Sequence, residues 1–379
     1  MIKSFIFILL IICVSLYSYY VYDKYNKLEI KTHINNDTPT IVVTPEIKDF
    51  SQPEQLPVND IIEKTSNSMQ MKVLNIIYIP SSNNQIDLSE TGALNITTAN
   101  SLVEYVNSIT TQSLSKLTEG SRYHQYKKSF SNPLLQYSLI DTKVYYENLP
   151  SGLPLPWKEN TNRPDYKKIL EKENICNYVD NMNLKEVWVW GYHTEKIEPV
   201  ESNMSMGKKI KEKWNKNEYG DVSNSEMSDD LPICNKTYVL FNLNYGRGVG
   251  EVLENHTHHI EAVNNYIHSD LWNKFVGVSG DQEKYSCGWT HYPPNVMKYT
   301  TGHDYDWYNT RSVMSDCTDW KPDGTGKKEL VSCSTWSKNN CEDDGGVAFK
   351  VWWMQNIPAL DDKVGNWWKL IGDFDDSIK

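Results

Sequence analysis

Short, almost wholly apolar segments that alternate with helix-like segments constrain the fold of this chain more than any other feature. The clearest are MKVLNIIYIP (71–80), EVWVWGYH (186–193) and TYVLFNLNY (237–245), and each has the length and content of a buried strand. Between them lie segments whose apolar residues recur at helical spacing. Strands and helices in alternation predict an α/β or α+β fold, in which helices flank a layered mixed sheet.

Composition divides the chain into four parts. Residues 1–27 hold a long apolar run, and residues 28–70 scatter prolines among polar residues in the manner of a linker or stalk. Residues 71–150 predict a small α+β unit. Residues 151–379 predict a tryptophan-rich α/β domain that carries the functional site. Within that domain, VAFKVWWMQNIP (347–358) predicts a further buried strand.

The N-terminal apolar run predicts where the protein resides. It extends from Phe5 to Tyr22 and is broken only by two serines. This length approaches the roughly 20 residues that a membrane-spanning helix needs, and no small-residue cleavage site follows it. We therefore expect an uncleaved signal anchor, with one transmembrane helix and the bulk of the chain on the extracytoplasmic side of the membrane. Cleavage of this segment would instead make the protein secreted.

Cysteine usage agrees with export. Beyond the apolar run the cysteines are Cys176, Cys234, Cys287, Cys317, Cys333 and Cys341. An even number of cysteines in an exported chain favours disulfide bonds, although six cysteines allow fifteen pairings. Free buried thiols are the alternative.

Asn-x-Ser/Thr sequons predict a glycoprotein if the host glycosylates the chain. They lie at Asn36, Asn95, Asn203, Asn235 and Asn255. The last of them falls inside a predicted helix and would be a poor acceptor if that helix is packed.

The net charge of the chain limits the classes of ligand that it is expected to bind. The formal charge of −11 argues against a nucleic acid as partner, because contacts with phosphates need clustered Lys and Arg. An acidic surface suits cations and neutral, hydroxyl-rich molecules better. We therefore expect a divalent metal ion, with zinc favoured, or a glycan or other small polar ligand.

One segment, GEVLENHTHHIEAVNNYI (250–267), concentrates histidine and glutamate on a predicted helix. Helical spacing places His256 inside an apolar stripe and His259 on its border. The opposite face carries Glu254, His258 and Glu261, which are neighbours because they stand in i, i+4 and i, i+3 relation. Such a row is a plausible half-site for a divalent cation. The same row could be a general acid–base pair, with a glutamate fixing the imidazole tautomer. A solvated polar face with one favourable Glu–His pair is the other alternative.

Other residues complete the predicted site. His291 lies in CGWTHYPPN, where a cysteine and a Pro-Pro turn hold the backbone stiffly. Ligands of α/β proteins collect beyond the carboxyl ends of strands, where the sequence places Glu201 and Arg247. The metal ligands that we predict are His258, Glu261 and His291. The catalytic residues that we predict are Glu254, Glu201 and Arg247. Residues predicted to support the ligands from behind are His256, His259 and Asn295.

Several motifs together resemble a family of uncharacterised exported proteins. They are FNLNYGRGVGEVLENHTHHIEAV, CGWTHYPPN, DWKPDGTG and WWMQNIP with the following NWWKLIGDFD. The resemblance covers about residues 71–379 and implies that the family's His-x-x-Glu pair falls on His258 and Glu261. The extra histidines around that pair depart from the family pattern. The family has no established activity to carry over.

These observations leave three classes of function open. A membrane-anchored, metal-assisted hydrolase is the reading that the histidine–glutamate row favours, because a bound metal ion activates water. A surface module that binds glycans or a protein through tryptophans is the second reading. The third is a structural surface or virion protein without catalytic activity.

Overall fold

The computed structural model describes residues 68–378, except 93, 128–129, 156–157, 215–221, 223–230, 278–285, 297–305, 338–340, 342–343 and 360–364. The expected signal anchor and almost all of the expected linker lie outside these residues. Within the described part of the chain, no helix combines the length and the apolar character that crossing a bilayer requires.

A five-stranded mixed sheet is the centre of the fold, with strand order β4-β1-β7-β9-β8. Its strands are β4 (Leu135–Tyr145), β1 (Met69–Tyr78), β7 (Leu184–Gly191), β9 (Tyr238–Asn244) and β8 (Ser202–Ser205). The first four run parallel, and β8 pairs antiparallel with β9. The predicted α/β class with a mixed sheet is confirmed. One sheet contains strands from both sides of the boundary that we expected at residue 150.

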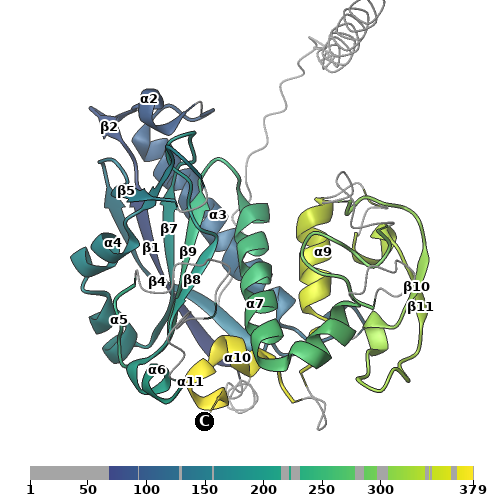
Figure 1. Cartoon of the computed structure of the whole chain (residues 1–379). Coiled ribbons are helices and arrows are strands. Elements are labelled where there is room, and N and C mark those ends of the chain that lie inside the picture. The colour runs from purple at the N-terminus through teal and green to yellow at the C-terminus, as the bar shows by residue number, and fades with distance from the viewer. Residues whose placement is uncertain are drawn as a thin grey trace, which may run out of the picture. The chain divides into compact units, whose positions relative to one another are not determined.

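Helices cover both faces of this sheet (Figure 1). On one face lie α3 (Ala99–Gly120) and α7 (Val249–Val276). The other face carries α4 (Tyr166–Lys172) and α5 (Ile175–Met182). They are separated at Asn174, whose φ of 49° is left-handed.

Adjacent residues of β9 show the two faces. Phe241 stacks on His256 of α7, whereas the next side chain, Asn242, accepts a hydrogen bond from Tyr166 of α4. Successive side chains of a strand point to opposite faces, so α7 and α4 must lie on opposite sides of the sheet.

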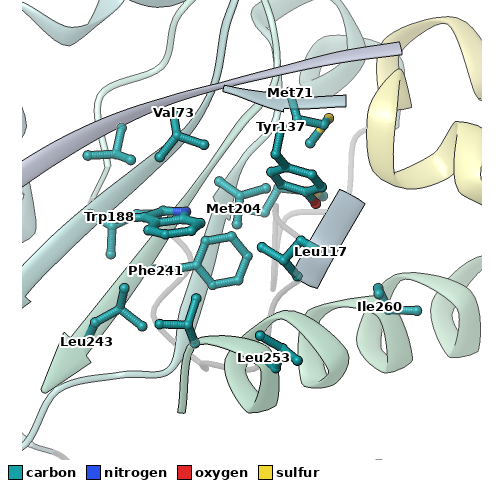
Figure 2. Close-up of a cluster of buried hydrophobic side chains, with 14 of the residues drawn as sticks. Met71, Val73, Leu117, Tyr137, Trp188, Met204, Phe241, Leu243, Leu253 and Ile260 are labelled. Carbon is teal, nitrogen blue, oxygen red and sulfur yellow. The ribbon is translucent and has the colours of Figure 1, made fainter. Parts of the chain in front are cut away.

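The core lies between the sheet and the pair α3 and α7. Figure 2 shows Trp188, Phe241 and Leu253 in one cluster, with other apolar side chains from β1, β4, β8 and both helices. Trp188 and Trp190 are fully buried on β7, and burial of such large rings supplies much of the driving force for this packing.

The strand predicted at 347–358 is wrong, because Gly345–Met354 forms helix α9. The carboxylate of Asp344 caps this helix by accepting a hydrogen bond from the backbone N–H of Val347. Nearly all residues of α9 are buried, since it packs against both α3 and α7. A helix that is apolar on every side shows no periodicity, so its sequence cannot be told from that of a buried strand.

The remaining elements are short. They are β2 (Ser81–Ser82), β3 (Gln85–Ile86), α2 (Leu88–Thr91), η3 (Gln125–Lys127), β5 (Ser151–Pro154), β6 (Asn162–Pro164), α6 (Lys208–Trp214), β10 (Val313–Ser315), η5 (Cys317–Asp319), β11 (Glu329–Val331), α8 (Cys333–Trp336), α10 (Trp368–Gly372) and α11 (Phe374–Ser377).

Three disulfide bonds confirm that the six distal cysteines are paired. They join Cys176 to Cys234, Cys287 to Cys317, and Cys333 to Cys341. The second bond bears on the site, because it anchors the segment that carries His291.

Two of the sequons are poorly placed for glycosylation. The side chain of Asn255 is buried and donates hydrogen bonds to the carbonyl oxygens of Glu201 and Asn242. Asn203 is buried on β8. Attachment of a glycan to either residue would require the surrounding structure to open. Asn36 lies outside the described residues.

Candidate metal centre

The first turn of α7 is fixed to the end of β9. The chain leaves β9 at Asn244 and enters α7 after Gly248, whose φ of 74° suits glycine. The carboxylate of Glu251 accepts a hydrogen bond from the backbone N–H of Asn244 at 2.8 Å. Arg247 lies 3.3 Å from the other oxygen of Glu251. The start of the helix is therefore tied to the strand that precedes it.

His256 sets the rotation of α7 about its axis. It is buried, and its Nδ1 donates to the carbonyl oxygen of Val252. Its Nε2 lies 2.9 Å from Oε2 of the buried Glu186 on β7. Trp188 donates to the same carboxylate oxygen at 2.8 Å. With His256 turned toward the sheet, Glu254 and His258 must face the other way, as the helical spacing predicted.

The face of α7 that carries Glu254 and His258 is covered by another segment of the chain, and three side chains meet there. Glu254 and His258 come from α7, and His291 comes from the segment 286–296. Each offers one ligand atom within 4.8 Å of the others. Nε2 of His258 lies 3.0 Å from Nε2 of His291, which lies 3.3 Å from Oε1 of Glu254. Ligands about 2.0–2.1 Å from a tetrahedral zinc ion are about 3.3 Å apart, so these two distances are compatible with one ion held by the triad of Glu254, His258 and His291.

Glu261 lies on the other side of His258. Its Oε2 is 2.8 Å from Nδ1 of His258, and its Oε1 accepts a hydrogen bond from the backbone N–H of Thr290 at 2.6 Å. An ionised carboxylate only accepts hydrogen bonds, so Nδ1 carries the proton. Glu261, which the sequence predicted as a ligand, therefore orients His258, whereas Glu254, predicted as a catalytic base, stands in the triad.

The segment that carries His291 is firmly held. Its Cys287 is bonded to Cys317, and the backbone N–H of Cys287 donates to the carbonyl oxygen of Phe275 at the end of α7. Gly288 has a φ of 68°, and a Cβ atom there would lie 2.0 Å from the carbonyl oxygen of Tyr292. A side chain at this position would break the turn, so His291 depends on this glycine for its position.

Burial and charged neighbours shift the pKa values of Glu254 and His258. Burial raises the pKa of Glu254, but His291, Lys350 and Arg247 outweigh burial and lower it to about 2. Burial raises the pKa of the neighbouring Glu251 to about 7. For His258, burial lowers the pKa, yet the hydrogen bond to Glu261 and the nearby carboxylates raise it overall. Glu254 is thus ionised at neutral pH and available to a cation.

Lys350 is a part of the centre that sequence reasoning missed. It lies on α9, is 1% exposed, and places its Nζ 3.4 Å from Oε2 of Glu254. Arg247 approaches the same carboxylate at 3.6 Å but is 47% exposed. A lysine inside the apolar run VAFKVWWM was the one available signal, since lysine is rarely fully buried without a partner.

Two predicted catalytic residues line the rim of the centre. The carboxylate of Glu201 is 41% exposed and lies 4.0 Å from Nε2 of His258. It directly precedes β8, and its carbonyl oxygen accepts a hydrogen bond from the backbone N–H of Asn242 on β9. Arg247 follows β9. Glu201 thus lies beside the carboxyl-terminal half of β9 and Arg247 beyond its end, close to where the architecture predicted a site.

Other predicted residues lie elsewhere. His259 is buried beside Phe241, where burial and His256 lower its pKa to about 3. Asn295 is buried and donates to the carbonyl oxygens of Asn309 and Arg311, so it braces a loop.

The tryptophans are mostly packed inside the molecule. The fully buried ones in the described part of the chain are Trp188, Trp190, Trp352, Trp353, Trp367 and Trp368. Rings buried in this way present no face to a sugar, so they act as core residues.

Comparison with protein-family models and with curated proteins yields no match to this chain.

Proposed function

We propose that this protein is a metal-dependent hydrolase that binds one zinc ion through Glu254, His258 and His291. Two imidazoles and one carboxylate form a donor set found in catalytic zinc sites, in which water takes the fourth position. The convergence of these three side chains, with Glu261 fixing His258, is the observation that carries the proposal. A hydrogen-bonded carboxylate behind a metal-binding histidine is the usual arrangement in zinc proteins.

The bound ion would supply the chemistry. Zinc lowers the pKa of its water to about 7 and polarises the carbonyl or phosphoryl group of a substrate. Glu201 suits the role of general base, because its carboxylate is partly exposed and lies beside the triad. Arg247 suits the role of an anchor for negative charge that develops on the substrate, because its guanidinium is half exposed at the rim.

Activity measurements test this proposal. The full chain is assayed against chromogenic carboxylic esters, phosphate esters, glycosides and peptide amides, before and after treatment with a chelator. We expect turnover of one class, loss of turnover with the chelator, and recovery with zinc. The variant Glu201→Gln should lower kcat and keep the metal. Turnover that survives complete metal removal, or absence of turnover in every class, would contradict hydrolase function.

A histidine on the same helix provides a matched control. His268 lies on α7 beyond the centre and stacks on Trp367. His268→Ala should keep metal and activity, whereas His291→Ala should lose both. Equal loss in the two variants would point to general damage to the helix rather than to a metal centre.

The three disulfide bonds support a second part of the proposal, namely that the protein works outside the cytosol. We propose that residues 5–22 anchor it there, in agreement with its resemblance to exported proteins. N-terminal sequencing of the membrane fraction tests the anchor. A mature N-terminus at about residue 20 to 25 would mean that the segment is cleaved.

A further inference from the structure

Lys350 is buried more deeply than its chemistry allows without a partner. It is 1% exposed, and every other lysine whose side chain is described is at least partly exposed. Its nearest charged neighbour is Oε2 of Glu254, at 3.4 Å. An ammonium group is strongly hydrated, so its burial is costly unless a carboxylate balances it.

The two oxygens of Glu254 face different groups. Oε1 lies 3.3 Å from Nε2 of His291, on the side of the proposed metal. Oε2 lies on the side of Lys350. One carboxylate thus connects the imidazole cluster to a buried positive charge, and a metal ion bound at Oε1 would stand close to that charge.

An aromatic ring covers the ammonium group of Lys350. Its Nζ lies over the ring of Trp307, 4.1 Å from the ring centroid. That ring is fixed, because its Nε1 donates to the carbonyl oxygen of Thr290 and its face packs against Gly346. The ammonium group therefore stays beside Glu254 whether or not a metal is bound.

We propose that Lys350 is a resident counter-ion of the metal centre, which stabilises the protein without metal and weakens its affinity for the ion. This inference rests on the metal centre proposed above and concerns how tightly that centre holds its metal. Without metal, the ammonium neutralises a buried carboxylate that would otherwise destabilise the fold. With metal, two cations share Glu254, and their repulsion favours release.

The substitution Lys350→Met tests both effects, because it keeps most of the side-chain volume and removes the charge. We expect the melting temperature of the metal-free protein to fall and the affinity for zinc to rise by about tenfold or more. The zinc-induced rise in melting temperature should then be larger in the variant than in the wild type. Simple damage to the packing of α9 would lower both stability and affinity.

Lys116→Met is the matched control. Lys116 also pairs with a glutamate, Glu119, at 2.8 Å, but both side chains are partly exposed, at 40% and 32%, whereas Lys350 is buried. We expect neither the melting temperature nor the zinc affinity to change appreciably, because exposed ion pairs contribute little.

The double variant Glu254→Gln/Lys350→Met keeps the inference testable if the single variant folds poorly. It contains neither charge, so it should be more stable than Lys350→Met in the absence of metal, and it should bind zinc weakly or not at all. A double variant no more stable than Lys350→Met would overturn the counter-ion role. So would failure of both variants to fold.

Zinc titration of the wild type separates the two proposals. Unchanged or weaker zinc affinity in Lys350→Met, beside a wild type that binds zinc, would overturn the inference and leave the proposed function standing. A wild type that binds no zinc would overturn the proposed function and, with it, the affinity effect.

Discussion

Nδ1 of His258 and Oε2 of Glu261 lie 2.8 Å apart, one turn from each other on α7. The second carboxylate oxygen of Glu261 accepts a hydrogen bond from the backbone N–H of Thr290, the residue next to His291. One glutamate therefore fixes the ring of the first imidazole and the backbone that carries the second. Because Nδ1 is held by Glu261, Nε2 of His258 is the nitrogen that faces the position where Glu254 and His291 converge.

We expect Glu261→Gln to weaken zinc binding roughly 10- to 100-fold without unfolding the protein. The amide has one acceptor oxygen, so it cannot serve both His258 and Thr290, and its oxygen is a weaker acceptor than a carboxylate. Competition with a chromogenic chelator measures the affinity, and circular dichroism reports the fold. Wild-type affinity in a folded variant would remove Glu261 from the account.

The substitution His256→Ala should lower the stability of the fold, in contrast to the effect of Glu261→Gln on zinc affinity. The substitution leaves a cavity and removes one hydrogen-bond partner of the buried carboxylate of Glu186, so we expect a loss of about 3 kcal/mol or more in the free energy of unfolding. Denaturant titration measures this loss. His268→Ala, on the same helix but partly exposed, should cost much less. A loss below about 1 kcal/mol for His256→Ala would show that the pair with Glu186 is not a structural anchor.

Removal of one disulfide bond should affect the metal and not only the fold. Cys287→Ser/Cys317→Ser frees the segment that carries His291, so both stability, by about 2–5 kcal/mol, and zinc affinity should fall. Cys176→Ser/Cys234→Ser removes a bond between α5 and the segment before β9, and it should lower stability alone. The two double variants are compared by thermal melting and zinc titration. Equal effects of both on zinc affinity would contradict a role for the Cys287–Cys317 bond in positioning His291.

Substitution of Gly288 tests the turn itself. Gly288→Ala places a methyl group against the carbonyl oxygen of Tyr292 at a φ that favours glycine. We expect lower stability and weaker zinc binding, because the turn that presents His291 must shift. Gly324→Ala is the control, since Gly324 also has a positive φ but no atom near its missing Cβ. It should cost some stability and leave zinc affinity unchanged.

The spacing of apolar residues predicted the orientation of those elements that have an apolar face on one side and a polar or solvated face on the other. The rotation of α7 is an example, because a stripe of apolar residues placed His256 inward and His258 outward from the sheet. Helix α9 shows the limit, since burial on every side erases the pattern that distinguishes a helix from a strand. Lys350 was missed for the same reason, as its position depended on that helix.

The choice of ligands depended on information that no local pattern contains. Glu254 and Glu261 flank His258 at i−4 and i+3, and helical spacing treats them as equivalent neighbours. Only the segment from Cys287 to His291 distinguishes them, because it brings an imidazole to Glu254 and a backbone N–H to Glu261. Packing between distant parts of the chain, rather than residue type, assigns these roles.

The zinc content of the full chain tests the central claim most directly. The protein is purified without added chelator and dialysed against zinc. Its metal-to-protein ratio is then measured by inductively coupled plasma mass spectrometry. We predict one zinc ion per chain in the wild type and in His268→Ala, and none in His258→Ala or His291→Ala. A wild type without bound metal, or full zinc content in His258→Ala, would contradict the account.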